Sequence, residues 1–313
     1  MRRTVLIDAP SNLGLRPPAP GCVPGCYKLA GALREQGLLR RLGALEGGVV
    51  VPPRYDLGEW REGEDGDFNA AALAGYTRKL AGRVERHVRD GDFPVVLGGD
   101  CSILLGAVLG LRRLGRYGVA YVDGHGDFRH PGNVAVSGPL GAAAGEGVAQ
   151  ITGRGQADLT DLDGLRPYVR DADVCVLGIR DADVCVLGIR DADEDQEEMA
   201  GLGIRHTPVG AIRRRGPDAV ARDTLKHLQS PPLDGFWIHL DAARTATRRG
   251  TVPPCSPASL RTSLRNPDRT WPRTALFRPA GTGFHGQQEA AAAGVARSSI
   301  ARQPWPRVCD APP

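Results

Sequence analysis

One short stretch of the chain carries residues that could bind metal ions. Asp123, His125 and Asp127 alternate directly after the apolar run Val119–Val122. In extended chain, residues i, i+2 and i+4 point to the same side, so these three side chains can converge on one point. Two carboxylates and an imidazole suit a divalent cation such as Mn²⁺ or Zn²⁺. The alternative for this pattern taken alone is a polar loop that contains a structural histidine.

Two other apolar runs also end in polar residues. Phe93–Leu97 leads into the sequence Gly-Gly-Asp-Cys-Ser at 98–102, and Gly235–Leu240 ends at Asp241. A strand followed by a Gly-Gly turn and a helix lets the backbone come close to a ligand. Open parallel sheets bind ligands at the carboxyl ends of their strands. We therefore expect these stretches and the first one to meet at one edge of a sheet.

The rest of the pattern predicts strands that alternate with helices, which is typical of an α/β protein with a parallel sheet and right-handed crossovers. Apolar runs predict strands, and apolar residues at helical spacing predict helices. The predicted strands are 4–7, 47–51, 93–97, 118–122 and 235–241, and the predicted helices are 27–42, 69–89, 103–114 and 218–228.

A ten-residue segment is duplicated. Residues 170–179 recur without change as 180–189, and each copy holds the buried-strand pattern Val-Cys-Val-Leu-Gly-Ile. Two copies of ten residues are too few and too short for a solenoid. We expect one copy to fill a strand position in the sheet, and the sequence does not decide which.

Composition limits the location and the partners. The chain has 313 residues and seven cysteines whose spacing shows no paired framework, so a reducing cytoplasm is favoured over export. No segment reaches the roughly 18 uninterrupted apolar residues of a membrane span, and the apolar run near the N-terminus is too short for a signal peptide. We expect a cytoplasmic protein with no membrane partner.

The pattern stops after Asp241. Residues 243–313 hold eleven arginines, no lysine and only three acids, Asp268, Glu289 and Asp310. This segment therefore accounts for the net charge of +4, and we do not interpret the charge as a nucleic-acid site. The alternatives are a disordered extension and a shifted reading frame, which we prefer. The predicted organisation is an α/β domain over 1–242, incomplete at its C-terminus, followed by an unpatterned tail over 243–313.

The three polar stretches together resemble the arginase/agmatinase/formiminoglutamase family, the ureohydrolases. Members carry Gly-Gly-Asp-His-Ser, Asp-Ala-His-x-Asp and Ser-x-Asp-x-Asp-x-x-Asp-Pro in that order. The corresponding residues here are 98–102, 123–127 and 239–243, and the resemblance covers about residues 4–242. It implies a three-layer αβα sandwich with a mostly parallel sheet, two Mn²⁺ ions per chain, a small guanidino substrate and, in many members, a homo-oligomer.

The resemblance also implies roles for single residues. The positions of Asp123 and Asp241 bridge both metals, that of Asp127 serves one metal and that of His125 serves the other. A metal-bridging hydroxide attacks the guanidinium carbon and releases urea, or a related amide, and an amine. The resemblance assigns no side chain to catalysis. Apart from the resemblance, His130 is a candidate proton shuttle because it lies in the loop after Asp127.

The sequence departs from the family at several positions. Cys101 stands where the family has a metal-binding histidine; a thiolate ligand favours zinc or iron, and the alternative is a packed thiol that binds nothing. Ala243 replaces the last aspartate ligand, so the metal site is expected to be incomplete. Ser137-Gly138 keeps only the start of the arginase substrate motif. Two hypotheses follow: a metal-dependent hydrolase, or an inactive pseudoenzyme or damaged gene product that keeps part of the fold.

Overall fold

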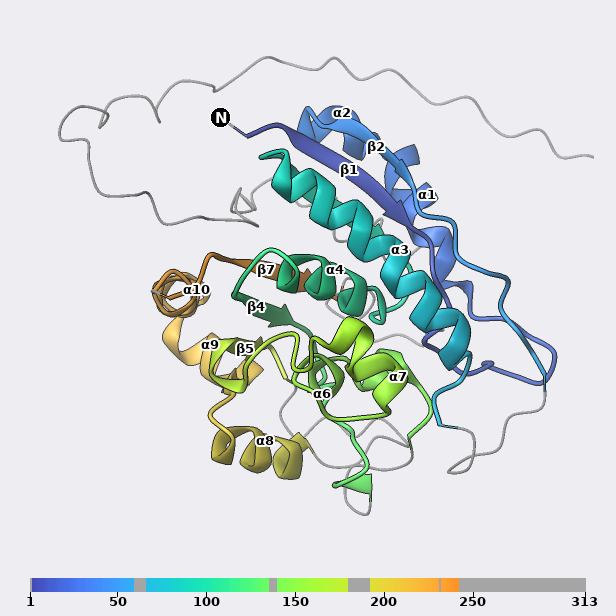
Figure 1. Cartoon of the computed structure of the whole chain (residues 1–313). Helices are drawn as coiled ribbons and strands as arrows, with labels where there is room; N and C mark the ends of the chain where they lie inside the picture. Colours follow the sequence, from blue (N-terminus) through green and yellow to red (C-terminus); the bar gives the residue numbers. More distant parts are fainter. Residues whose placement is uncertain (1, 59–65, 135–139, 180–191, 231, 242–313) are drawn as a thin grey trace, which may run out of the picture. The chain divides into compact units, whose positions relative to one another are not determined.

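The computed structural model describes residues 2–58, 66–134, 140–179, 192–230 and 232–241 (Figure 1). These residues all belong to one compact unit. The tail 243–313 with Ala243, the second copy of the repeat at 180–189, and Ser137-Gly138 lie outside the described residues.

The described strands form two parallel sheets. One has the strand order β2-β1-β3 and the other the order β6-β5-β4-β7. The strands are β1 Thr4–Ala9, β2 Leu45–Val49, β3 Phe93–Gly98, β4 Tyr117–Val122, β5 Val174–Leu177, β6 Arg205–Thr207 and β7 Gly235–Leu240. The predicted strands are confirmed, although β2 begins two residues earlier than expected. Sequence reasoning missed β6, which has only three residues and lacks an apolar run.

Helices connect the strands and cover them. The α-helices are α1 Leu29–Glu35, α2 Leu38–Leu42, α3 Ala70–Arg89, α4 Ile103–Arg112, α6 Gly147–Ile151, α7 Ala157–Thr160, α8 Ala192–Gly201, α9 Val209–Arg215 and α10 Pro217–Leu228; 3₁₀ turns occur at Gly25–Lys28, Ala143–Gly145, Leu162–Gly164 and Asp171–Asp173. The prediction of one helix over 27–42 is wrong. Gly37 has φ 75°, a left-handed conformation that ends α1 and starts α2.

Alternating side chains place helices on both faces of the strands. On β4, Val119 and Tyr121 belong to the large core cluster that includes α3 and α4, whereas Ala120 packs with Leu228 of α10. On β1, Leu6 likewise packs toward α1, on the face opposite the large cluster. The three-layer αβα arrangement is therefore confirmed.

Helices α3 and α4 lie side by side (Figure 1), and glycines of α4 allow the close approach. A Cβ on Gly110 would lie 2.6 Å from the carbonyl oxygen of Ala81 in α3. This packing fixes α4, whose N-terminus follows the Gly-Gly turn.

The first copy of the repeat supplies a strand. Val174–Leu177 forms β5, which pairs with β4 in the register Val119↔Val174. The expectation that one copy fills a sheet position is thus confirmed for residues 170–179.

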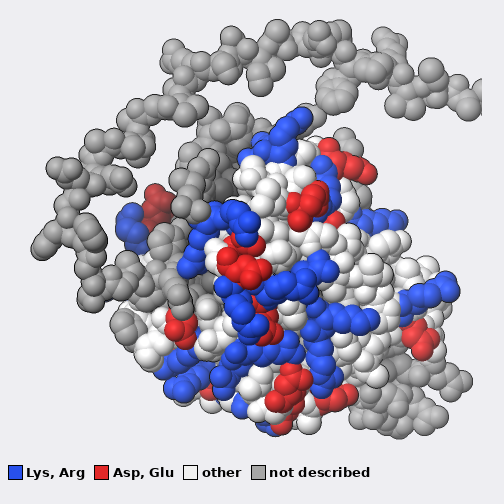
Figure 2. Space-filling model, turned by 45° about the horizontal axis from the view of Figure 1, so that its top comes forward, with Lys and Arg blue, Asp and Glu red and all other residues white. Residues whose placement is uncertain are grey.

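Charged side chains of both signs are interspersed on the face shown in Figure 2. Ion pairs among the described residues include Arg78 Nε with Asp163 Oδ1 at 3.1 Å and Arg113 Nη1 with Glu85 Oε2 at 3.2 Å. Opposite charges at these distances partly neutralise each other.

Candidate metal centre

The ends of β4 and β7 lie next to each other, and this brings acidic residues together. The two strands pair in register, with Tyr121 opposite His239 and Val122 opposite Leu240. The amide of Asp241 then donates to the carbonyl oxygen of Val122 at 3.0 Å. Because the pairing continues to the strand ends, the residues that follow them meet at one edge.

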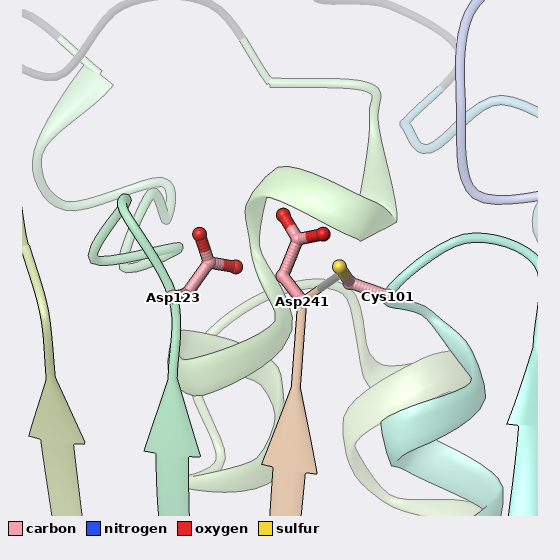
Figure 3. A group of neighbouring side chains, drawn as sticks. All are labelled: Cys101, Asp123 and Asp241. Carbon is pink, nitrogen blue, oxygen red and sulfur yellow. The ribbon is translucent and has the colours of Figure 1, made fainter. Parts of the chain in front are cut away.

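Five predicted metal-ligating residues form two overlapping groups. Cys101, Asp123 and Asp241 make one group, and Asp123, His125 and Asp127 make the other; within each group, one potential ligand atom per residue lies within 4.8 Å of the others. Asp123 belongs to both. Figure 3 shows the carboxylates of Asp123 and Asp241 and the sulfur of Cys101 pointing toward one another from β4, β7 and the turn before α4.

Asp123 is almost fully buried, with 2% of its surface exposed. Its Oδ1 accepts a hydrogen bond from the backbone amide of His125 at 2.9 Å, and His125 Nδ1 lies 3.3 Å from the same oxygen. Burial acts to raise the pKa of Asp123, but the hydrogen bonds from His125 outweigh it and the pKa is lowered. Among the described residues nothing donates to Asp123 Oδ2. A buried oxygen without a partner costs free energy, which a bound cation would recover.

Asp127 has an unusual backbone. Its φ is 44°, in the left-handed region that non-glycine residues seldom adopt. Its carbonyl oxygen accepts from the amides of Val148 at 2.9 Å and Ala149 at 3.3 Å, and its Oδ2 accepts from the hydroxyl of Tyr121. Burial and then the charge of Asp123 raise the pKa of Asp127 well above its usual range. A divalent cation would favour the ionised carboxylate instead, so the donor set fits a metal.

Cys101 belongs to the same donor group as Asp123 and Asp241. Burial, followed by the carboxylates of Asp127 and Asp241, raises the pKa of its thiol well above the ordinary value. Its sulfur lies within 4.8 Å of a carboxylate oxygen of Asp123 and of Asp241. The ligand role of Cys101 stays a prediction.

The turn before Cys101 is held by the loop that follows β1. Asp100 Oδ1 accepts from the amide of Ser102 at 2.8 Å, and Oδ2 accepts from the amide of Gly14 at 3.2 Å. A Cβ on Gly99 would lie 1.6 Å from the carbonyl oxygen of Ser11, so only glycine permits this contact. Sequence reasoning gave no role to Ser11 or Gly14, because their partner lies far along the chain.

His130 is engaged on both ring nitrogens. Its Nδ1 accepts from the amide of Gly132 at 3.1 Å, and its Nε2 lies 2.9 Å from Glu198 Oε1 in α8. The nitrogen that accepts from an amide carries no proton, so Nε2 donates to Glu198. These contacts hold the loop against α8, and the proton-shuttle role stays a prediction.

Tyr121 was missed at the sequence level, although a signal exists. It lies two residues before Asp123 on the same strand, so its side chain points to the same side. The ring of His239 stacks on it, and burial lowers the pKa of His239 to about 4. His239 is therefore neutral at pH 7 and forms part of the packing beneath the crevice.

A family model described as the arginase family matches residues 19–241. The chain belongs to the arginase family. The arginase of Bacillus caldovelox is 30% identical over 215 residues, which are 67% of this chain and 67% of that protein. The arginase of Staphylococcus aureus strain COL is 27% identical over 242 residues, which are 75% and 73% of the two chains.

Solved structures agree with this membership. The arginase from Bacillus caldovelox superposes with a TM-score of 0.62 at 26% identity, covering 76% of this chain and 75% of that one. The formimidoylglutamase from Bacillus subtilis has a TM-score of 0.54 at 17% identity, with coverage of 78% and 66%, and this likeness concerns the fold alone. The arginase-family chain is thus a hydrolase of the ureohydrolase type. Its described helices include none with the length and apolar character needed to cross a bilayer.

Proposed function

We propose that this chain hydrolyses a guanidino or amidine C–N bond, as an arginase or agmatinase does, and releases urea, or a related amide, and an amine. The observation that carries the proposal is the position of Asp123, which belongs to both donor groups and keeps one buried oxygen without a partner among the described residues. Such a shared carboxylate suits a pair of cations.

In this proposal Asp123 and Asp241 would contribute to holding both Mn²⁺ ions, Asp127 would hold one of them and His125 the other. Cations held here would lower the pKa of a water molecule and so supply the nucleophile for the guanidinium carbon. The backbone amide of His125 orients Asp123, and the hydroxyl of Tyr121 orients Asp127.

Cys101 adds a sulfur donor beside Asp123 and Asp241. Sulfur is a softer ligand than the imidazole that the family carries at this position, so zinc competes better with manganese here than at an all-oxygen and nitrogen site. We propose that Cys101 binds metal and that the metal preference of this chain is shifted accordingly.

Metal content and product release test the proposal together. The full chain is stripped with EDTA, loaded with Mn²⁺ or Zn²⁺, and measured for ions per chain and for urea release from L-arginine and from agmatine. We expect two ions per chain, with the ion served by His125 bound more weakly because Ala243 replaces a carboxylate ligand of the family, and urea from at least one probe. Asp123→Asn should lose both ions, whereas Asp218→Asn, at an exposed position in the first turn of α10, should keep them.

Two results would count against the proposal. A folded chain that takes up no ion after loading would rule out the hypothesis of a metal-dependent hydrolase. A chain that binds two ions but releases no urea from either probe would favour the inactive pseudoenzyme.

We also propose a cytoplasmic location, because the cysteine spacing shows no paired framework, and a homo-oligomer, as the family resemblance implies. Cell fractionation tests the first, and light scattering of the purified chain tests the second. A monomer at micromolar concentration would contradict the oligomer.

A further inference from the structure

A second cluster of buried polar side chains lies outside the metal ligands. Asp67, Glu146 and Gln150 are 4%, 3% and 0% exposed. The side-chain amide of Gln150 donates to Asp67 Oδ2 at 2.7 Å and to Glu146 Oε2 at 3.3 Å. Glu146 Oε1 accepts from the amides of Gly141 at 2.9 Å and Ala142 at 3.2 Å.

The carboxyl group of Asp67 holds its proton to an unusually high pH. Burial, then the charge of Glu146 and a hydrogen bond to it, raise the pKa of Asp67 to about 8, with a smaller contribution from the exposed Asp158. At neutral pH Asp67 is therefore protonated and donates to Glu146. Two ionised carboxylates at this place would repel each other in a site of low dielectric constant.

The cluster joins segments that are far apart in the sequence. Asp67 stands just before α3, and the amide of the next residue, Phe68, donates to the carbonyl oxygen of Gly141 at 3.1 Å. Glu146 is the residue directly before α6. The hydrogen bonds that join Asp67, Glu146 and Gln150 therefore fix the start of α6 against the segment before α3.

Helix α6 in turn holds Asp127. The amides of Val148 and Ala149, in the first turn of α6, both donate to the carbonyl oxygen of Asp127. A Cβ on Gly147 would lie 3.9 Å from the hydroxyl oxygen of Tyr121, the group that donates to the Asp127 carboxylate. A left-handed φ at a non-glycine residue persists only where the surroundings hold it, and α6 provides that restraint.

We propose that Glu146, locked in place by Asp67 and Gln150, is a positioning residue for the metal ligand Asp127. The inference rests on the proposed function, because it assumes that Asp127 holds a cation. When the hydrogen bonds of Glu146 are lost, α6 no longer restrains the backbone of Asp127. The ion that Asp127 serves is then bound more weakly. The other ion keeps its remaining ligands.

Mn²⁺ binding to the full chain, followed by electron paramagnetic resonance, tests this. Glu146→Ala should lower the affinity for the Mn²⁺ ion that Asp127 serves by about 10–100-fold. This is the range seen when groups that orient metal ligands are removed. Asp218→Asn, which removes an exposed carboxylate of α10 outside the cluster, is the control and should bind both ions as the wild type does. Thermal unfolding in EDTA is measured for each variant.

A pH comparison separates positioning from general damage to the fold. Asp67→Asn places an amide where the protonated carboxyl donates to Glu146, so its hydrogen bonds do not depend on pH. Between pH 7 and pH 9 Asp67 of the wild type loses its proton. The affinity of the wild type for the ion that Asp127 serves should therefore fall relative to that of Asp67→Asn.

The outcomes are distinguishable. Wild-type chain that binds no Mn²⁺ overturns the proposed function and this inference together. Wild type that binds two ions while folded Glu146→Ala binds them equally well overturns the inference alone. If Glu146→Ala does not fold, a wild-type to Asp67→Asn affinity ratio that stays constant from pH 7 to pH 9 overturns it.

Discussion

The rings of Tyr121 and His239 lie parallel, with their centroids 4.8 Å apart and their planes 3° apart. The two residues are opposite each other in the pairing of β4 with β7, and each lies two positions before an aspartate of the candidate metal centre. The stack therefore fixes the spacing of the two strand ends that supply Asp123 and Asp241.

Tyr121→Phe keeps the stacked ring and removes the hydroxyl that donates to Asp127. We expect Mn²⁺ affinity to fall by about 10–100-fold, while the free energy of unfolding in EDTA falls by only about 1 kcal/mol. Tyr76→Phe is the control, because the Tyr76 hydroxyl donates to the carbonyl oxygen of Val50 at 2.9 Å, outside the metal centre. Equal Mn²⁺ affinity in the two variants would show that the Tyr121 hydroxyl does not orient a ligand.

His239 should make the protein less stable in acid. Burial lowers the pKa of His239 in the folded chain to about 4, against about 6.5 in unfolded chain. Between these values the unfolded state binds a proton and the folded state does not, so the free energy of unfolding falls by about 3 kcal/mol as the pH drops through this range. His239→Phe keeps an aromatic ring and should lack this loss. Urea unfolding of both proteins in EDTA at pH 7 and near pH 4 measures it, and equal losses would contradict the prediction.

Cys101→His restores the residue that the family carries at this position. Imidazole is a harder ligand than thiolate, so the variant should bind Mn²⁺ more tightly relative to Zn²⁺ than the wild type does. Competition between the two metals for the stripped chain gives the ratio. Cys22→Ser, at an exposed free cysteine, should leave the ratio unchanged. A ratio that is also unchanged in Cys101→His would indicate a packed thiol.

Gly99→Ala should disturb both the fold and the metal centre. Its Cβ would lie 1.6 Å from the carbonyl oxygen of Ser11, so the loop after β1 and the turn that carries Cys101 must move apart. We expect a loss of about 1–3 kcal/mol in the free energy of unfolding together with weaker Mn²⁺ binding. Gly75→Ala, at an exposed position of α3 with open space around its Cβ, should instead be neutral or stabilising by up to about 1 kcal/mol. Chemical denaturation of both variants provides the comparison, and a Gly99→Ala variant as stable as Gly75→Ala would contradict the expected clash.

Local patterns in the amino-acid sequence were enough to predict the α/β class, most strands and the alternation of Asp123, His125 and Asp127. These features depend on local geometry, because the period of a strand or helix is a property of a few neighbouring residues. The same reasoning failed at Gly37, where the apolar spacing continues through a left-handed residue, and at β6, which is too short to show a period.

The contacts between distant groups could not be predicted from local patterns, because they depend on how the whole chain packs. Two identical segments offered the same strand, and pairing with β4 places the first copy in the sheet. The approach of Cys101 to Asp123 and Asp241, and the hydrogen bond from Gln150 to Asp67, join segments tens of residues apart. Strand register and helix packing set such distances, and both arise from the whole core rather than from the pattern within any one segment.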